Sequence, residues 1–137
     1  PRGTTGLLDG TKPGATCSRP VSLVSLFPTI TELCGVPRKD DNDGPSLVPL
    51  LKNPQADWPH AAICSLHHQG SFAVSTDDWR YIHYANGDEE LYHIPSDQYE
   101  WNNLAGEAKH AGKLAELRKL LPKDPAPRWT PPAGDRK

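Results

Sequence analysis

The sequence has no long apolar run, no excess of basic residues and no closely paired cysteines. No apolar run approaches the ~20 residues that span a membrane, so we expect no membrane partner. The formal net charge is −2 and no basic stripe occurs, which argues against nucleic acid as a partner. Cys17, Cys34 and Cys64 form no C-x-x-C pair, so a structural zinc site is not expected. We interpret the three thiols as small buried residues, with a disulfide as the alternative.

The ends of the sequence say little about its compartment. It begins at Pro1 rather than Met, so we expect the natural N-terminus to lie upstream, and a signal peptide would not be visible. The 137 residues suffice for one domain with a modest core. Fifteen prolines, gathered at segment ends and in the tail, indicate short elements joined by loops.

Apolar residues at mostly helical spacing predict a short buried helix at about residues 25–34. Ser25 is the expected N-cap, which places Pro28 in the first turn, where its missing N–H costs nothing. Gly35 suits the position after the helix, and Pro37 blocks its continuation.

A charged stretch follows at residues 38–44. Its acidic residues resemble part of a calcium loop, but the spacing and the closing Glu of an EF-hand are absent. We therefore interpret it as a solvated turn. Ser46 is a possible cap for one or two helical turns in residues 46–51.

From residue 61 the apolar period changes to two, which is typical of strands. Four strands are predicted, at residues 61–66, 71–75, 79–84 and 89–94. Their short, turn-like breaks, such as Asn86-Gly87-Asp88, require antiparallel neighbours. The sequence therefore predicts a four-stranded antiparallel meander.

A last helix is predicted at about residues 107–121, with an apolar stripe that fits one face of the sheet. The stripe consists of Ala111, Leu114, Leu117, Leu120 and Leu121. Trp79 and Tyr81 are expected to fill the layer between sheet and helix. The predicted fold class is α+β: a four-stranded antiparallel sheet packed by a C-terminal helix and preceded by a short helix.

Five short strings occur together in one order, and together they resemble the C-terminal part of the sulfatases in the alkaline phosphatase superfamily. The strings lie at residues 19–29, 32–37, 43–51, 79–84 and 90–105. The most similar subgroup is the iduronate-2-sulfatase-like enzymes of bacteria, and the resemblance covers about residues 11–121. It implies three segments: a remnant of the larger α/β catalytic domain at 1–40, the C-terminal subdomain at 41–122 and a flexible Pro-rich tail at 123–137.

The resemblance also implies what chemistry lies elsewhere. Sulfatases use a formylglycine made from the Cys or Ser of a C-x-P-x-R motif, beside a calcium ion. None of Cys17, Cys34 and Cys64 has both the Pro and the Arg of that motif at the required spacing. We therefore expect no catalytic residue and no metal ligand in this chain, with calcium held by the parent enzyme.

The expected partners follow from the same resemblance. They are the missing N-terminal catalytic domain and, in the parent, a sulfated small molecule or glycan. A periplasmic or secreted compartment is implied by the resemblance alone.

His67 and His68, between the first two predicted strands, are the candidate substrate-binding residues. Imidazoles beside a sulfate gain charge, because the anion raises their pKa. The alternative is that both are ordinary exposed turn residues.

Three functions stay open at this point. The leading one is a C-terminal fragment of a sulfatase, inactive alone, whose parent hydrolyses sulfated sugars or aryl sulfates. The others are a fragment of a related phosphodiesterase or phosphonate hydrolase, and a free-standing carbohydrate- or partner-binding α+β module. The fragment hypothesis predicts an exposed apolar patch on the sheet or on the helix at 25–34, with self-association.

Overall fold

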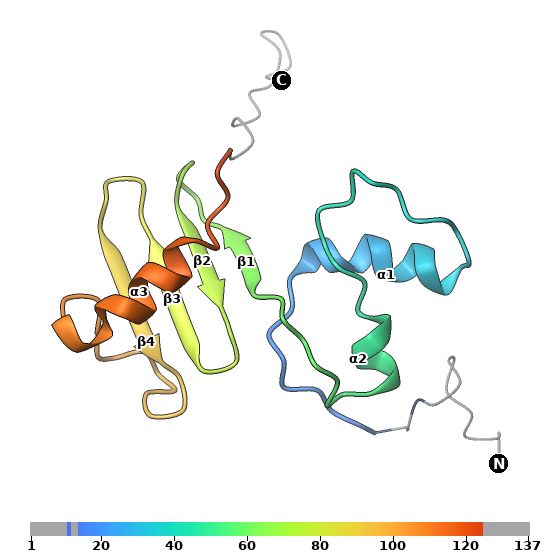
Figure 1. The fold of residues 1–137 in the computed structure, drawn as a ribbon, viewed down its shortest axis with the longest axis horizontal. Helices are drawn as coiled ribbons and strands as arrows, with labels where there is room; N and C mark the ends of the chain where they lie inside the picture. The colour runs from blue at the N-terminus through green and yellow to red at the C-terminus, as the bar shows by residue number, and fades with distance from the viewer. Residues whose placement is uncertain (1–10, 12–13, 125–137) are drawn as a thin grey trace, which may run out of the picture. The chain divides into compact units, whose positions relative to one another are not determined.

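The computed structural model describes residue 11 and residues 14–124, which form two compact units (Figure 1). The first unit holds the described residues up to Ala62 together with Ser75–Asp78, and the second holds Ile63–Val74 and the described residues from Trp79 onward. The division proposed at residues 40 and 122 concerns ancestry and stays a prediction. Most of the predicted flexible tail lies outside the described residues. None of the described helices has the length and apolar character needed to cross a membrane.

The first helix, α1, spans Leu26–Leu33 and follows a 3-10 turn at Leu23–Ser25, which confirms the predicted helix. Ser25 does not cap it as predicted. Its backbone is already helical, at φ −74° and ψ −13°, and its side chain makes no capping hydrogen bond. The reason is the 3-10 turn that precedes α1. Because of it, the residue with the extended backbone typical of an N-cap is Ser22 and not Ser25.

The end of α1 is a Schellman motif built around Gly35. Gly35 has φ +68°, in the left-handed region that glycine adopts without steric cost. Its N–H donates to Glu32 O at 3.0 Å, and the N–H of Val36 donates to Thr31 O at 2.9 Å. These two bonds satisfy carbonyls that the helix end leaves open, so Gly35 terminates the helix as predicted.

The apolar side chains of α1 and its approach are exposed, so the prediction of a buried helix is wrong. The exposed set is Val21, Leu23, Val24, Leu26, Phe27, Ile30, Leu33 and Val36. The buried residues are Ser25, Pro28 and Thr29, because this narrow side faces the segment leading to α2. The apolar patch expected of a fragment is present on this helix, and we call it the α1 patch.

Helix α2, Val48–Lys52, begins with its first N–H groups satisfied by hydroxyls. Thr29 Oγ1 accepts from the N–H of Leu47 at 2.8 Å, and Ser46 Oγ accepts from the N–H of Val48 at 3.2 Å. Pro49 has no N–H to satisfy. Ser46 thus acts at the helix start, as its position in the sequence indicates.

The three cysteines are exposed free thiols, which corrects their interpretation as buried residues. Cys34 ends α1 at its open end, and Cys64 lies in β1, an edge strand of the sheet.

The sheet contains β1 (Ala62–Ser65), β2 (Phe72–Ser75), β3 (Trp79–His83) and β4 (Glu89–His93) in that spatial order. This confirms the predicted meander. Strands β3 and β4 pair antiparallel, with Tyr81 opposite Leu91. These two side chains are fully buried.

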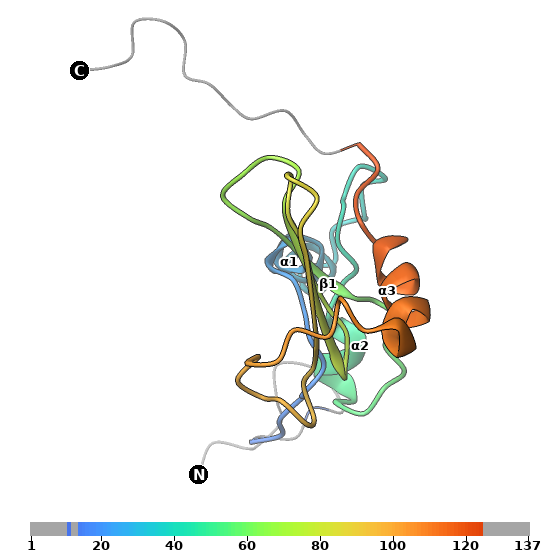
Figure 2. The same ribbon diagram turned by 90° about the vertical axis from the view of Figure 1, so that its left-hand side faces the viewer.

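Helix α3, Ala111–Arg118, follows a 3-10 turn at Ala108–His110 and lies along one face of the sheet (Figures 1 and 2). Leu114 and Leu117 are buried, each at about 1.5–3 kcal/mol for a fully buried side chain. The helix ends at Arg118, three residues before the predicted end, and Leu120 is 40% exposed. The predicted stripe therefore packs only in part.

Candidate functional site

The two candidate substrate-binding residues lie together in the turn between β1 and β2. His67 and His68 are both exposed, and their rings meet edge to face with centroids 5.0 Å apart. The turn is closed by two backbone hydrogen bonds of 2.9 Å, from Ser71 N–H to His68 O and from Leu66 N–H to Ser71 O. Gly70 supplies a φ of +85°. The turn thus presents two adjacent imidazoles that can donate to an anion.

A second polar cluster ties α3 to the sheet through Glu89. Its carboxylate accepts from Tyr81 Oη at 2.6 Å and from Arg118 Nε at 2.6 Å, and His83 Nδ1 lies 4.0 Å away. The hydrogen bonds from Arg118, with help from Tyr81, hold the pKa of Glu89 at about 2 although burial opposes this. A carboxylate this acidic is a weak proton acceptor near neutral pH, so the cluster is a structural tie and not a general base.

A third cluster lies on the other face of the β3–β4 pair. Glu90 accepts from Tyr84 Oη at 3.0 Å and from Tyr92 Oη at 2.9 Å. Burial and the bond to Glu90 raise the pKa of Tyr92 to about 12, and the bond to Glu90 raises that of Tyr84. Both phenols stay neutral at physiological pH and supply no nucleophile.

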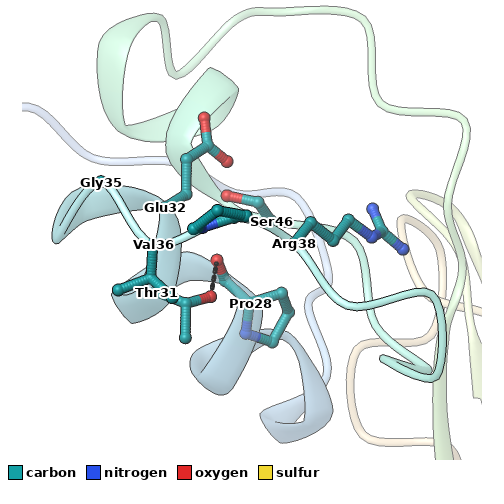
Figure 3. Close-up of a pocket in the computed structure, with 8 residues that line it drawn as sticks. Pro28, Thr31, Glu32, Gly35, Val36, Arg38 and Ser46 are labelled. Carbon is teal, nitrogen blue, oxygen red and sulfur yellow. Dashed lines mark hydrogen bonds between the residues drawn. The ribbon is translucent and has the colours of Figure 1, made fainter.

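A pocket of about 350 Å³ lies at the C-terminal end of α1 (Figure 3). Pro28 and Val36 are among its apolar residues, and Glu32 and Arg38 point in different directions from it. The Thr31 hydroxyl donates to Pro28 O at 3.1 Å and is thereby occupied. The pocket is a hollow with charged sides and contains no paired nucleophile and base.

The residues that the structure describes include no group of three or more His, Cys, Asp or Glu side chains able to hold a metal ion. The surface features of the described residues are the His67–His68 turn, the pocket and the α1 patch.

Neither the Glu89 cluster nor the pocket was predicted from the sequence. The sequence did contain a signal for the Glu89 cluster. Glu89 and Leu91 lie on the same face of β4, the face that α3 covers, and a carboxylate there needs a cationic partner. The pocket depends on how the segment after Gly35 returns past α1, which no local pattern specifies.

The family of N-sulphoglucosamine sulphohydrolase C-terminal regions matches residues 8–125. A sulfatase of Formosa agariphila is 36% identical over 110 residues, covering 80% of this chain and 22% of that protein. An N-acetylglucosamine-6-O-sulfatase of Bacteroides thetaiotaomicron is 34% identical over 122 residues, covering 80% of this chain and 22% of that protein.

The fold has a counterpart in a solved structure of a protein in complex with its substrate, D-glucosamine-2-N,6-O-disulfate. That match has a TM-score of 0.70 and 32% identity, and it covers 81% of this chain and 25% of the other. The chain thus spans between a fifth and a quarter of the length of the proteins named above.

Proposed function

The chain belongs to the family of sulfatase C-terminal regions, and from this membership we propose that the protein containing it is a sulfuric ester hydrolase. The observation that carries the proposal is the family match over residues 8–125, supported by 36% identity to a sulfatase. In this proposal the chain supplies fold and binding surface, while the nucleophile is supplied by the rest of the protein.

The substrate class proposed is a sulfated amino sugar. Two findings support this: one relative is named as an N-acetylglucosamine-6-O-sulfatase, and one solved structure contains a bound glucosamine disulfate. We assign His67 and His68 to contact the anionic group of that substrate. Their support is exposure and adjacency, since two neighbouring imidazoles can donate to one sulfate.

Calcium is the metal proposed for the parent enzyme. Sulfate oxygens are hard ligands, which a divalent calcium ion binds in preference to soft donors. Because the described residues include no candidate metal cluster, the ligands are assigned to the rest of the protein.

The partner proposed for the α1 patch is the catalytic domain of the same protein. Eight exposed aliphatic or aromatic residues on one short segment form a surface of the kind that a neighbouring domain covers. The short span of this chain relative to its relatives supports this occupant.

The test is hydrolysis by the full-length protein of three substrates: glucosamine 6-O-sulfate, an aryl sulfate and a phosphonate monoester. We expect turnover of the amino-sugar sulfate, loss of turnover in a chelator and recovery with added calcium. Turnover of the phosphonate alone would overturn the proposal in favour of a phosphonate hydrolase. An inactive full-length protein that still binds sulfated sugar would favour a binding module.

The histidine assignment has its own test. The His67→Ala/His68→Ala double variant should raise KM for the amino-sugar sulfate several-fold and leave kcat nearly unchanged. Ser65→Ala, an exposed neighbour, is the matched control. Equal kinetic constants in the double variant and the control would refute the assignment.

A further inference from the structure

Tyr99 and Trp101 form an exposed aromatic pair in the loop after β4. Their rings stack with centroids 5.3 Å apart and an angle of 24° between planes. Tyr99 is 66% exposed and Trp101 79% exposed. In the described part of this unit, the other large apolar residue that is exposed is Leu120. The described residues of this unit thus expose fewer large apolar side chains than the α1 patch does.

The backbone that carries the pair is fixed at its tip. The Asp97 carboxylate accepts from the N–H of Trp101 at 3.1 Å and of Asn102 at 2.8 Å. Glu100, between the two aromatic residues, has φ +58°, which is uncommon for a residue other than glycine. This conformation holds Tyr99 and Trp101 on the same side of the loop.

The loop is also fixed to β4. Asn103 Oδ1 accepts from the N–H of Leu91 at 3.0 Å, and Asn103 Nδ2 donates to Glu89 O at 3.1 Å. The N–H of Leu104 donates to Leu91 O at 2.8 Å. An aromatic pair on a loop fixed at both places loses little freedom on binding, which favours affinity.

The size of the pair selects the kind of ligand. A stable protein interface buries at least about 1,200 Å² around a core of several apolar residues, and two rings beside the exposed polar residues Gln98 and Asn102 fall short of this. An aromatic face is electron-rich and attracts C–H groups, which a pyranose ring presents in a flat array. Polar neighbours suit the hydroxyl groups around such a ring.

The geometry points to a glycan-binding platform in which a sugar ring stacks on Trp101 while Tyr99 supports the indole from behind. The ligand class is a glucosamine-containing oligosaccharide, which extends the proposed function from a sulfated monosaccharide to a chain and rests on it for the choice of sugar. Arg80 Nη2 lies 3.8 Å from Glu100 Oε1, and this ion pair adds a further contact between the loop and β3.

The test uses the full-length protein and a heparin hexasaccharide. Trp101→Ala should raise KM for the hexasaccharide by about tenfold with kcat unchanged, and Trp101→Phe should stay near wild type. Leu120→Ala, which removes an exposed apolar side chain of the same unit, is the matched control. A Trp101→Ala KM within twofold of wild type, or an equal increase in the Leu120→Ala variant, would overturn the platform.

Calorimetry with the desulfated hexasaccharide separates the platform from the sulfatase proposal, because this ligand has no sulfate ester to hydrolyse. We expect the wild type to bind it and the Trp101→Ala variant to bind about tenfold more weakly. Binding without any sulfatase turnover would leave the platform standing and sink the proposed function. Turnover of a sulfated substrate without binding of the desulfated hexasaccharide would overturn the platform and leave the proposed function standing.

Discussion

Arg118, the last residue of α3, donates from Nε to one carboxylate oxygen of Glu89 at 2.6 Å and from Nη2 to the other. The pair joins the end of the helix to the first residue of β4, and the Glu89 side chain is only 15% exposed. Tyr81 Oη donates to the same carboxylate. Helix and sheet are therefore held by a polar tie beside the apolar contacts of Leu114 and Leu117.

The first prediction concerns this tie. Glu89→Gln should lower the free energy of unfolding of the chain by about 1–2 kcal/mol, because it removes charge-assisted hydrogen bonds to a partner that is half exposed. The measurement is urea unfolding, read as a lower midpoint at unchanged slope. Glu107→Gln, which breaks the exposed pair with Lys109, should leave the midpoint in place.

The second prediction is the pH dependence of the same tie. The pKa of Glu89 falls from its ordinary 4.5 to about 2 on folding, mainly through the hydrogen bonds from Arg118. A lowered carboxyl pKa stabilises the fold above the unfolded value, and this stabilisation is lost as the pH falls from about 4.5 through about 2. The free energies of unfolding of the wild type and Glu89→Gln should therefore converge as the pH falls across that window. A stability difference between the two proteins that stays constant down to pH 2 would contradict the assignment.

The third prediction contrasts two glycines of the first unit. A Cβ at Gly44 would lie 2.7 Å from the backbone carbonyl atoms of Val24, whereas one at Gly35 meets nothing within 4 Å. Gly35→Ala should cost about 1 kcal/mol, from its φ of +68° alone. Gly44→Ala should cost more, because backbone must move. Thermal unfolding of the two variants shows which loses more stability. A larger loss in Gly35→Ala than in Gly44→Ala would show that Gly44 does not lie this close to the backbone of Val24.

Most of the fold could be predicted from local patterns, and the reasons are specific. Alternation with short polar breaks predicted all four strands, since hairpin turns allow only antiparallel neighbours. Gly35 and Pro37 predicted the end of α1. These signals act within a few residues, so a single sequence contains them.

Burial could not be predicted in the same way. Apolar residues at 21–33 predicted a buried helix, yet they are exposed in this chain. Periodicity identifies the apolar face of a helix, but it does not show whether another element packs against that face. The Glu89–Arg118 pair joins residues 29 positions apart, and Tyr99 and Trp101 are given their direction by the backbone of Glu100. Such relationships depend on the folded chain.

The fourth prediction is that the α1 patch causes self-association of the 137-residue chain. Phe27 and Ile30 are both more than half exposed, so water is in contact with apolar surface that a partner would otherwise cover. A Phe27→Ser/Ile30→Ser variant should sediment as a smaller species and bind less of a dye that reports apolar surface. A wild-type chain that is monomeric at high concentration and binds no dye would contradict this.

The last prediction concerns Asn103, which connects the aromatic loop to the sheet. Its Oδ1 accepts from the N–H groups of Leu91 and Ala105, at 3.0 and 2.9 Å, and its Nδ2 donates to Glu89 O. Asn103→Ala leaves the N–H of fully buried Leu91 without this acceptor, so we expect a loss of about 1–2 kcal/mol.

Amide hydrogen exchange can locate the effect of Asn103→Ala. The amides of Leu91 and Ala105 should exchange faster in the variant, whereas the amide of Leu66 in the distant β1–β2 turn should not change. Asn103→Asp keeps an accepting oxygen, but it replaces the donor to Glu89 O with a carboxylate oxygen that the Glu89 carbonyl repels. A smaller loss in Asn103→Asp than in Asn103→Ala would therefore show that the two accepted bonds hold the loop. If neither variant changes exchange at Leu91, the backbone bond from Leu104 to Leu91 is sufficient by itself.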